Sequence, residues 1–336
     1  MRTKYFMPAI AMIFTLVLAG CGGGGGGDFG GPTLITYTGL TTQAVITQAN
    51  AKSLAGCAYQ GRSTGRALGG VAASAQTNVT DHQINHPLTL VLSETLRNAL
   101  GKIDVTALPR ANLGAAVKTE TITEQGSCGG SFSGSATYDD VTGNISSGSI
   151  TFNNYCNEGV TLSGKISFSG KVNLGTQPPT MEKLSMNFVA LSGKSGSDAF
   201  TATGIVAIDA TAHPHVLTTI NMVSRDDTTG KVYKIENYQL LASASPGVLV
   251  DVSMTGRFYG PDDGYVDLAT PQIPFRFYIN NGVMDTTPSQ GELVVTGDKG
   301  SKATLVTLNN TDYRIDVDEN GDGTLEKQIS GKWADL

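Results

Sequence analysis

The chain has 336 residues, of which 15% are charged, and its 23 basic and 29 acidic residues give a net charge of −6. This acidic balance argues against nucleic acid as a partner, because binding to phosphates needs clustered Lys and Arg. With 42 glycines and abundant Ser and Thr, the composition is typical of a β-rich protein with a neutral polar surface, and less so of a helical cytosolic enzyme.

Residues 1–20 have the layout of an export signal. Arg2 and Lys4 precede an apolar stretch, residues 9–19, which is shorter than the roughly 20 apolar residues of a transmembrane helix. The stretch ends in Leu18-Ala19-Gly20-Cys21, which resembles the lipobox of bacterial lipoproteins. That resemblance implies cleavage before Cys21, acylation of its sulfur and its amine, and anchoring to a membrane by several acyl chains.

The residues after Cys21 predict a flexible tether. Residues 21–32 are rich in glycine, and a coil of this length reaches about 18 Å. In the lipobox family an Asp after the cysteine favours the inner membrane, so Gly22 predicts the outer membrane, with the protein facing the periplasm or the cell surface. Cleavage would remove two of the 23 basic residues and no acidic one, so the net charge would fall from −6 to −8.

Residues 33–115 are predicted to contain a strand or two and two helices. Residues 33–46 indicate strand, and Thr47 is a suitable N-cap for a helix over 48–59. Residues 61–86 are low in complexity and predict a loop or disorder. A second helix is predicted over about 87–100, because Pro87 stands at its start, Gly101 at its end, and apolar residues recur at helical spacing.

From residue 116 to residue 336 the apolar period changes to two. For example, Leu162, Ile166 and Phe168 alternate with polar residues, which indicates strands that bury one face. About thirteen strands follow one another without an intervening helix. We therefore expect a mostly β protein, a long antiparallel meander curved into an open barrel or sandwich, with the two N-terminal helices packed on its apolar face. One domain is expected, and the alternative is a split near residues 243–247.

The cysteines suggest one disulfide. Two alternating runs, 130–139 and 144–155, flank a turn that ends in Gly143. A hairpin with Gly143 in the left-handed conformation places Phe132 opposite Phe152 and Cys128 opposite Cys156. This pairing gathers the apolar residues on one face and also superposes the two thiols. By elimination Cys57 is a free thiol, and we expect a small buried helix residue rather than a nucleophile.

Residues 316–326 carry a calcium-type pattern. Oxygen-bearing side chains at loop positions 1, 3 and 5 and a glycine at position 6 are the spacing that folds a chain around a hard cation. The candidate Ca²⁺ ligands are Asp316, Asp318, Asn320, Asp322 through its carbonyl, and Glu326. The loop departs from the EF-hand because Lys327 occupies position 12 and strands flank it. A calcium ion would stabilise the last hairpin, and the alternative is an acidic turn without metal.

Other motifs do not amount to a catalytic site. Gly61-Arg62-Ser63-Thr64-Gly65 matches the nucleophile-elbow pattern, but that motif needs a strand before it and a helix after it. Asp262, Asp263 and Asp267 form a second acidic turn, for which we expect no ligand. His213-Pro214-His215 is interpreted as a turn rather than a metal site.

The C-terminal residues are similar to a group of uncharacterised proteobacterial lipoproteins. The similar stretch runs from Gly256-Arg257-Phe258-Tyr259 through the calcium-type loop to Trp333-Ala334-Asp335-Leu336, and the resemblance implies no activity. The leading hypothesis is a non-catalytic, lipid-anchored envelope protein that is structural or binds a protein partner. The alternative is a carrier of lipid or another apolar ligand in a curved-sheet cavity, and a hydrolase of unknown substrate is the third.

Overall fold

The computed structural model describes residues 34–70 and 117–336, apart from residues 158, 176–179, 197, 246–248, 281–282 and 286. The expected signal, the tether with Cys21, and the helix expected at 87–100 lie outside the described residues. The elements of the described part are α1 (Ala51–Gly70), β1 (Val117–Gln125), β2 (Gly129–Asp139), β3 (Asn144–Asn157), β4 (Val160–Asn173), β5 (Thr180–Ser195), β6 (Asp198–Asp209), β7 (His215–Asp226), β8 (Val232–Ser245), β9 (Leu249–Gly260), β10 (Gly264–Ala269), β11 (Phe275–Asn280), β12 (Val283–Met284), β13 (Glu292–Thr296), β14 (Lys302–Thr307), β15 (Asp312–Asp318) and β16 (Lys327–Lys332), with 3₁₀ turns at Asp298–Gly300 (η2) and Trp333–Asp335 (η3).

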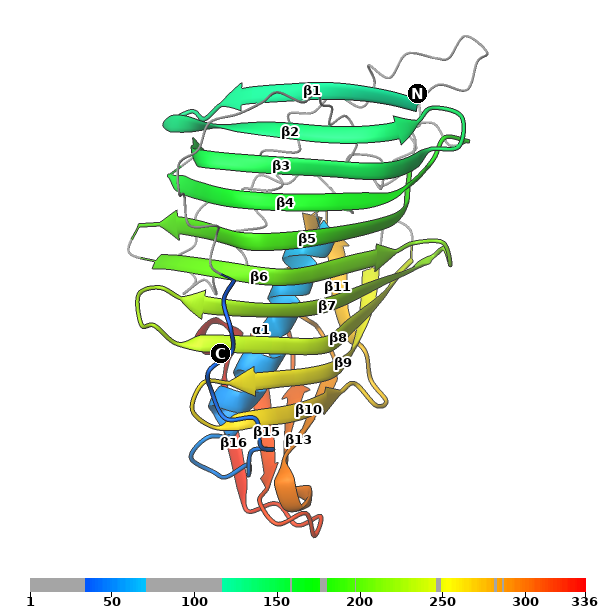
Figure 1. Cartoon of the computed structure of the whole chain (residues 1–336). Coiled ribbons are helices and arrows are strands. Elements are labelled where there is room, and N and C mark those ends of the chain that lie inside the picture. Colours follow the sequence, from blue (N-terminus) through cyan, green and yellow to red (C-terminus); the bar gives the residue numbers. More distant parts are fainter. Residues whose placement is uncertain are drawn as a thin grey trace.

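The strands form one open antiparallel meander. From β1 to β10 each strand pairs with the next strand of the chain, and the order continues through β13, β14 and β15 to β16. β11 pairs with the first part of β9 and β10 with the second. Figure 1 shows the long strands side by side in a curved sheet, with β1 at the top edge and α1 behind the sheet. The expected mostly β, antiparallel and unclosed fold is confirmed, with sixteen strands in the described residues.

A row of β-bulges curves the long strands. The pairing register shifts between residues 152 and 155, 188 and 191, and 236 and 239. One residue of each bulge is left-handed: Asn154 (φ 49°), Ala190 (φ 46°) and Asn237 (φ 48°). The N–H of each donates to a side-chain oxygen of a neighbouring strand, that of Ser163, Thr203 and Asn221 respectively. Because a bulge bends its strand, a row of bulges bends the whole sheet.

Aromatic rings lie over glycines on the inner face of the sheet. A Cβ added to Gly148 would lie 2.2 Å from the Phe168 ring, and one added to Gly193 would lie 2.2 Å from the Phe200 ring. Both pairs are directly opposed across strands. The glycines on the apolar face therefore make room for flat rings in a closely packed core.

The helix α1 packs on the inner face, mainly against β6–β10 and β13–β15. Its buried residues recur at helical spacing and form one stripe: Ala51, Leu54, Ala55, Ala58 and Tyr59. The Tyr238 hydroxyl donates to the Ala58 carbonyl at 3.0 Å, and the Gln60 amide donates to the Leu336 carbonyl at 2.6 Å. Small residues let this stripe lie close to the sheet and to the C-terminus.

The N-terminal predictions need correction. The helix spans Ala51–Gly70 rather than 48–59, so residues 61–70 of the expected loop are helical. Helix nucleation is the costly step and extension is cheap, so the packed first turns support a low-propensity continuation. Thr47 does not cap the helix, because its hydroxyl and its N–H both bond Asn50 Oδ1.

The strand expected within 33–46 is reduced, in its described part, to one parallel bridge, Gln43 with Tyr265. The Ala44 N–H donates to the Tyr265 carbonyl at 2.8 Å, but the Ala44 carbonyl accepts from the Asp298 N–H at 2.7 Å. The Ile46 N–H donates to Ser301 Oγ at 2.9 Å. This segment therefore lies between β10 and η2 and divides its hydrogen bonds between them, so no ladder forms.

Candidate functional site

The loop between β15 and β16 is the candidate site, and it lies at the bottom of Figure 1. Asp318 ends β15 and folds the loop around itself: its carboxylate accepts the Gly321 N–H at 2.7 Å and the Gly323 N–H at 3.0 Å. Both glycines have positive φ, 76° and 86°, which glycine adopts without strain. The Glu326 carboxylate accepts the Glu319 N–H at 2.7 Å. These bonds bring distant acidic residues of the loop together.

Three carboxylates converge in this loop. Carboxylate oxygens of Asp318, Asp322 and Glu326 lie within 4.8 Å of one another. Asp318 is only 5% exposed, while the other two are exposed. The Thr324 N–H donates to the Asp322 carboxylate and lowers its pKa, which favours the anionic form. Hard oxygen ligands suit Ca²⁺ or Mg²⁺, so this acidic triad could hold a metal ion.

Two of the five candidate ligands are not in the triad, and Asp322 joins it through its carboxylate rather than through the predicted backbone carbonyl. The Asp316 carboxylate forms a bidentate pair with Arg314, with both N–O distances 2.7 Å, and accepts the Gln328 amide at 2.9 Å. Asn320 Oδ1 accepts the Asp322 N–H at 2.8 Å. The loop that gathers oxygens therefore starts two residues later than the sequence pattern suggested.

The sequence does contain a signal for the later frame. Asp318-Glu319-Asn320-Gly321-Asp322-Gly323 also has oxygens at positions 1, 3 and 5 and glycine at position 6. In this frame Glu326 takes position 9, a ligand position in EF-hand loops. Arg314 decides between the frames, because residues two apart on a strand share a face and Arg314 thus reaches Asp316.

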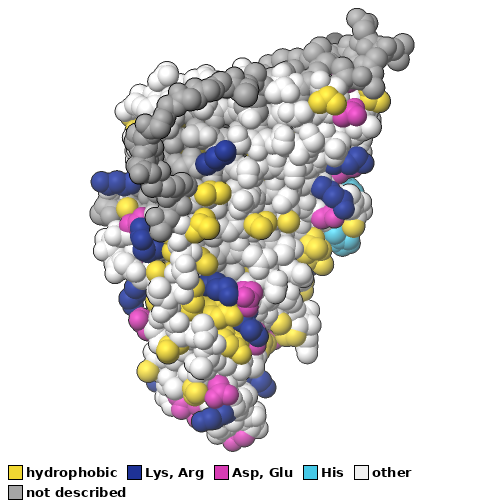
Figure 2. Space-filling model, viewed as in Figure 1, with side chains coloured by type: hydrophobic (Ala, Val, Ile, Leu, Met, Phe, Trp, Pro, Cys, Tyr) yellow, Lys and Arg dark blue, Asp and Glu magenta, His cyan; other side chains and the backbone are white. Residues whose placement is uncertain are grey.

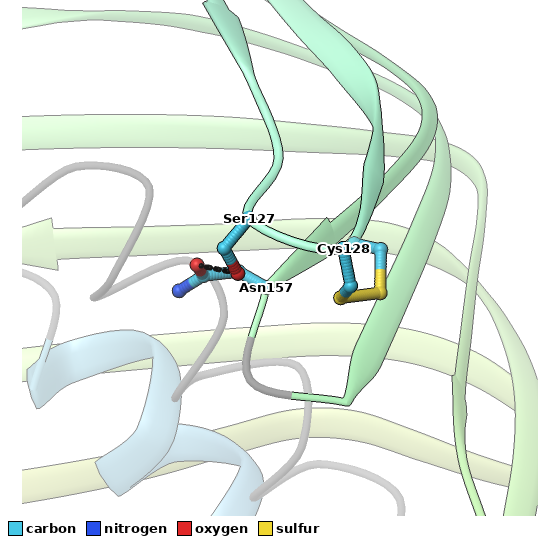
Figure 3. Close-up of a disulfide and its surroundings, with 4 residues drawn as sticks. Ser127, Cys128 and Asn157 are labelled. Carbon is cyan, nitrogen blue, oxygen red and sulfur yellow. Dashed lines mark hydrogen bonds between the residues drawn. A yellow bond between two sulfur atoms is a disulfide. The ribbon is translucent and has the colours of Figure 1, made fainter.

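The expected disulfide is present. Cys128 and Cys156 are bonded, with Cα atoms 5.1 Å apart, and Ser127 Oγ donates to Asn157 Oδ1 at 2.8 Å beside them (Figure 3). Phe132 pairs with Phe152 as predicted, but Gly129 rather than Cys128 stands opposite Cys156. The bulge at Asn154 shifts the register by one residue at this end. Cys57 is a free cysteine on α1, and burial raises the pKa of its thiol, which suits a packing role.

A cluster that the sequence reasoning missed lies on the outer face of β8–β10. Lys234, Tyr259 and Tyr265 form one cross-strand row, and Glu236, Arg257 and Asp267 form the next. Lys234 Nζ lies 4.5 Å from the centre of the Tyr259 ring, and the Arg257 guanidinium lies 4.0 Å from that of Tyr265. The available signal was a charged or aromatic residue at two alternate positions of each strand, namely Lys234 and Glu236, Arg257 and Tyr259, and Tyr265 and Asp267. Asp267 of the second acidic turn is thus paired with Arg257, at 2.8 Å.

The outer face also has a groove of about 710 Å³ across the ends of β3–β7. Lys171 and Lys183, which line it, are directly opposed. Each has a carboxylate partner, Glu182 at 2.8 Å and Asp209 at 2.9 Å. Serines, Asn144 and Thr219 line it together with the apolar residues Ile145, Leu184, Ala207, Ile208 and Leu217. Figure 2 shows few coloured side chains on the upper part of this face, whereas hydrophobic side chains gather lower down among small groups of opposite charge.

The nucleophile-elbow pattern lies in a helix, and the His213-Pro214-His215 motif lies in an exposed turn. Ser63 lies inside α1, so the elbow pattern lacks its preceding strand, and His213 and His215 are exposed around the turn that enters β7. No protein-family model, curated protein or solved structure matches this chain. In the part of the chain that the structure describes, no helix has the length and apolar content needed to cross a membrane.

Proposed function

We propose that this chain is a non-catalytic, lipid-anchored protein of the outer membrane, whose rigid sheet is structural or binds a protein partner. The lipobox at residues 18–21 supports the anchor. The observation that carries the non-catalytic role is that many charged side chains of the sheet form ion pairs with one another. Arg276 with Asp251, Arg257 with Asp267, and Lys332 with Asp312 are ion pairs between adjacent strands.

The pKa shifts of the acidic groups point the same way. The hydroxyl of Thr211 lowers the pKa of Asp209 to about 2, and Lys332 lowers the pKa of Asp312 to about 2. Lys234 likewise lowers the pKa of Glu236. A general acid or base works best with a pKa near the operating pH, so catalytic carboxylates are usually raised toward neutrality. The pKa values of these carboxylates are instead lowered, so the carboxylates stay ionised at neutral pH, which suits a stabilising role.

The anchor is tested by metabolic labelling with an alkyne fatty acid. Wild-type protein should carry the label and remain in the membrane fraction, whereas Cys21→Ser should carry none and appear in the soluble fraction. Cys57→Ser is the matched control, because Cys57 is a thiol inside α1, and it should label like the wild type. Equal labelling of the Cys21→Ser protein would refute the anchor.

We further propose that Asp318, Asp322 and Glu326 bind Ca²⁺ and stabilise the last hairpin. A ligand that binds only the folded state at about 100 times its Kd adds roughly 2.7 kcal/mol to the unfolding free energy. Millimolar CaCl₂ should therefore raise the Tm of the wild type, and Asp318→Asn should lose this calcium-dependent rise. Asp335→Asn, a change to an exposed carboxylate in η3, should keep it. An unchanged wild-type Tm would leave the loop as an acidic turn.

A second candidate is a carrier of lipid or another apolar ligand. Its support is the apolar character of the inner face of β2–β5, where Phe132, Phe152, Phe168 and Phe188 are buried, while α1 packs mainly on later strands. Native mass spectrometry of protein purified from envelopes tests it. A co-purifying lipid that is lost in Phe152→Asp favours the carrier, and a mass equal to the acylated polypeptide favours the scaffold.

A further inference from the structure

The groove on the outer face of the sheet runs across the strands rather than along them. Its volume is about 710 Å³. Its floor is one cross-strand row, in which each residue stands directly opposite the next: Ser169, Ser185, Ala207 and Thr219. Because neighbouring strands lie about 4.8 Å apart, a groove that crosses the five strands β3–β7 is about 19 Å long. This shape suits an extended chain better than a compact small molecule.

Longer side chains stand on both sides of this floor. On one side the next row of directly opposed residues is Asn144, Lys171, Lys183 and Asp209. On the other side Asn187 and Ile205 oppose each other, and both are exposed. Successive outer-face residues are two apart on each strand, so a row of small residues between two rows of longer ones leaves a furrow. The strands β3–β7 lie side by side in Figure 1.

The floor of the groove offers hydroxyl groups and little apolar surface. Ser169 and Ser185 are exposed. Leu184 and Ile208 are buried on the other face of the sheet, so they line the groove through their backbone. That backbone is already paired between strands. An acyl chain would therefore find little apolar area here, and an extended peptide would find no free backbone groups with which to form a strand pair.

The charged side of the groove is electrically balanced. Lys171 pairs with Glu182 at 2.8 Å and Lys183 pairs with Asp209 at 2.9 Å, so two ammonium groups meet two carboxylates. The two lysine side chains are still 50% and 57% exposed. Because an ammonium group has three donors, each lysine keeps donors for a ligand while it holds its carboxylate. A phosphate or another anion would gain little from a row without net charge.

We propose that this groove binds an extended chain of a neutral polysaccharide. Sugar hydroxyls both donate and accept hydrogen bonds, and the groove presents ammonium donors, carboxylate acceptors and serine hydroxyls along its length. Leu217, which lines the groove, and the neighbouring Ile205 offer apolar surface to the C–H groups of the sugar rings. A site built to bond hydroxyls discriminates strongly against ligands that lack them. This inference does not depend on the lipid anchor or on calcium.

Co-sedimentation of the full-length protein, in a non-ionic detergent, with insoluble polysaccharides tests the proposal. The probes are cellulose, chitin and curdlan, which are neutral, and phosphocellulose, which is anionic. The wild type should pellet with at least one neutral probe. Its affinity should change less than about twofold between low and high salt, because salt screens only charged contacts. Pelleting with none of the neutral probes, or with phosphocellulose alone, would overturn the proposal.

Variants of the floor locate the binding in the groove. Ser185→Leu and Ser169→Leu each remove a hydroxyl and fill the furrow, and each should weaken binding about tenfold, the effect of one lost hydrogen bond in a blocked site. Ser133→Leu is the matched control, because Ser133 is an exposed serine on β2 and is not part of the groove lining. It should bind like the wild type. Unchanged binding in both groove variants, or an equal loss in Ser133→Leu, would refute this site.

Discussion

Removing the Cys128–Cys156 disulfide should lower the unfolding free energy without changing the folded structure. The bond closes a chain segment with a sequence separation of 28. The loop-entropy relation for that length gives about 3.6 kcal/mol at 25 °C. We expect the double variant Cys128→Ala with Cys156→Ala to lose roughly 3 to 4 kcal/mol.

The structure explains why this loss falls on the unfolded state. The Cys128 N–H already donates to the Cys156 carbonyl at 3.2 Å, and Ser131 pairs with Asn153 immediately beyond. Gly126 packs so closely on Cys156 that an added Cβ would lie 2.2 Å from its carbonyl oxygen. The hairpin geometry therefore persists without the covalent bond. Only the unfolded chain gains the freedom that the crosslink removed.

Urea unfolding followed by circular dichroism and by tryptophan fluorescence measures the effect. The sheet dominates the dichroism, while Trp333 packs against Tyr59 and Tyr313 far from the disulfide in the chain. If the sheet unfolds as one unit, both signals move to lower urea together. Cys57→Ala is the control and should cost less than about 1.5 kcal/mol. A loss below about 1 kcal/mol in the double variant would refute the entropic account.

Three further predictions concern the sheet. Ala190→Gly should raise the unfolding free energy by about 1 kcal/mol, because Ala190 is left-handed at φ 46° and this conformation costs a non-glycine residue roughly 1–2 kcal/mol. The control Ala207→Gly, on the regular strand β6, should lower the unfolding free energy. The urea midpoints of the two variants measure the difference. Gly148→Ala should lower the unfolding free energy by about 1–3 kcal/mol, since the new Cβ would lie 2.2 Å from the Phe168 ring and 2.6 Å from the Ser135 carbonyl. The control Ser149→Ala, on the outer face, should change the urea midpoint little. The pKa of Asp209 is lowered from 3.8 to about 2 in the folded state, so the stability it contributes is complete above pH 3.8 and is lost as the pH falls through about 2; Asp209→Asn should make urea midpoints less sensitive to pH in this window, and an unchanged pH slope would contradict the shift.

Local pattern and turn chemistry predicted the centre of the fold well. The turn at Gly143, with φ 69°, closes the hairpin, and Phe132 opposes Phe152 as expected, although the register shifts by one residue between Thr137 and Tyr138. The turn at Gly230 repeats the same hydrogen bond, from the glycine N–H to the carbonyl of an aspartate four residues earlier. These features depend on residues that are close together in the sequence, so the sequence alone could predict them.

The bulges were not predictable in the same way. An alternating run looks the same with or without one extra residue until its partner strand is known. Asn154 and Asn237 are residue types that tolerate the left-handed conformation, yet Ala190 occupies the equivalent place. The side-chain oxygen that satisfies the Ala190 N–H comes from Thr203 on another strand. Long-range pairing therefore decides where each bulge falls.

The ligands of the acidic loop could not all be predicted from the sequence, for the same reason. Two overlapping frames offer oxygens at the right spacing, one from Asp316 and one from Asp318. Spacing cannot decide between them, because the deciding contact is a salt bridge outside the motif, from Arg314 to Asp316 at 2.7 Å. An acidic residue two positions after an arginine on one strand face should thus be counted as paired before it is counted as a ligand.

The helix α1, the disulfide and the loop around Asp318 stabilise different parts of the open sheet. Local opening starts where strands have fewest buried neighbours, which in an unclosed meander means its two ends. α1 packs mainly on β6–β10 and β13–β15, so it supports the middle of the order and leaves β1–β4 without a helix among the described residues. The disulfide joins β3 to the turn that leads into β2, and the loop around Asp318 connects the last two strands. Since α1 packs mainly on later strands, the disulfide should matter most for the hairpin of β2 and β3, and hydrogen exchange of these two strands should speed up in the double cysteine variant while that of β13–β15 stays the same.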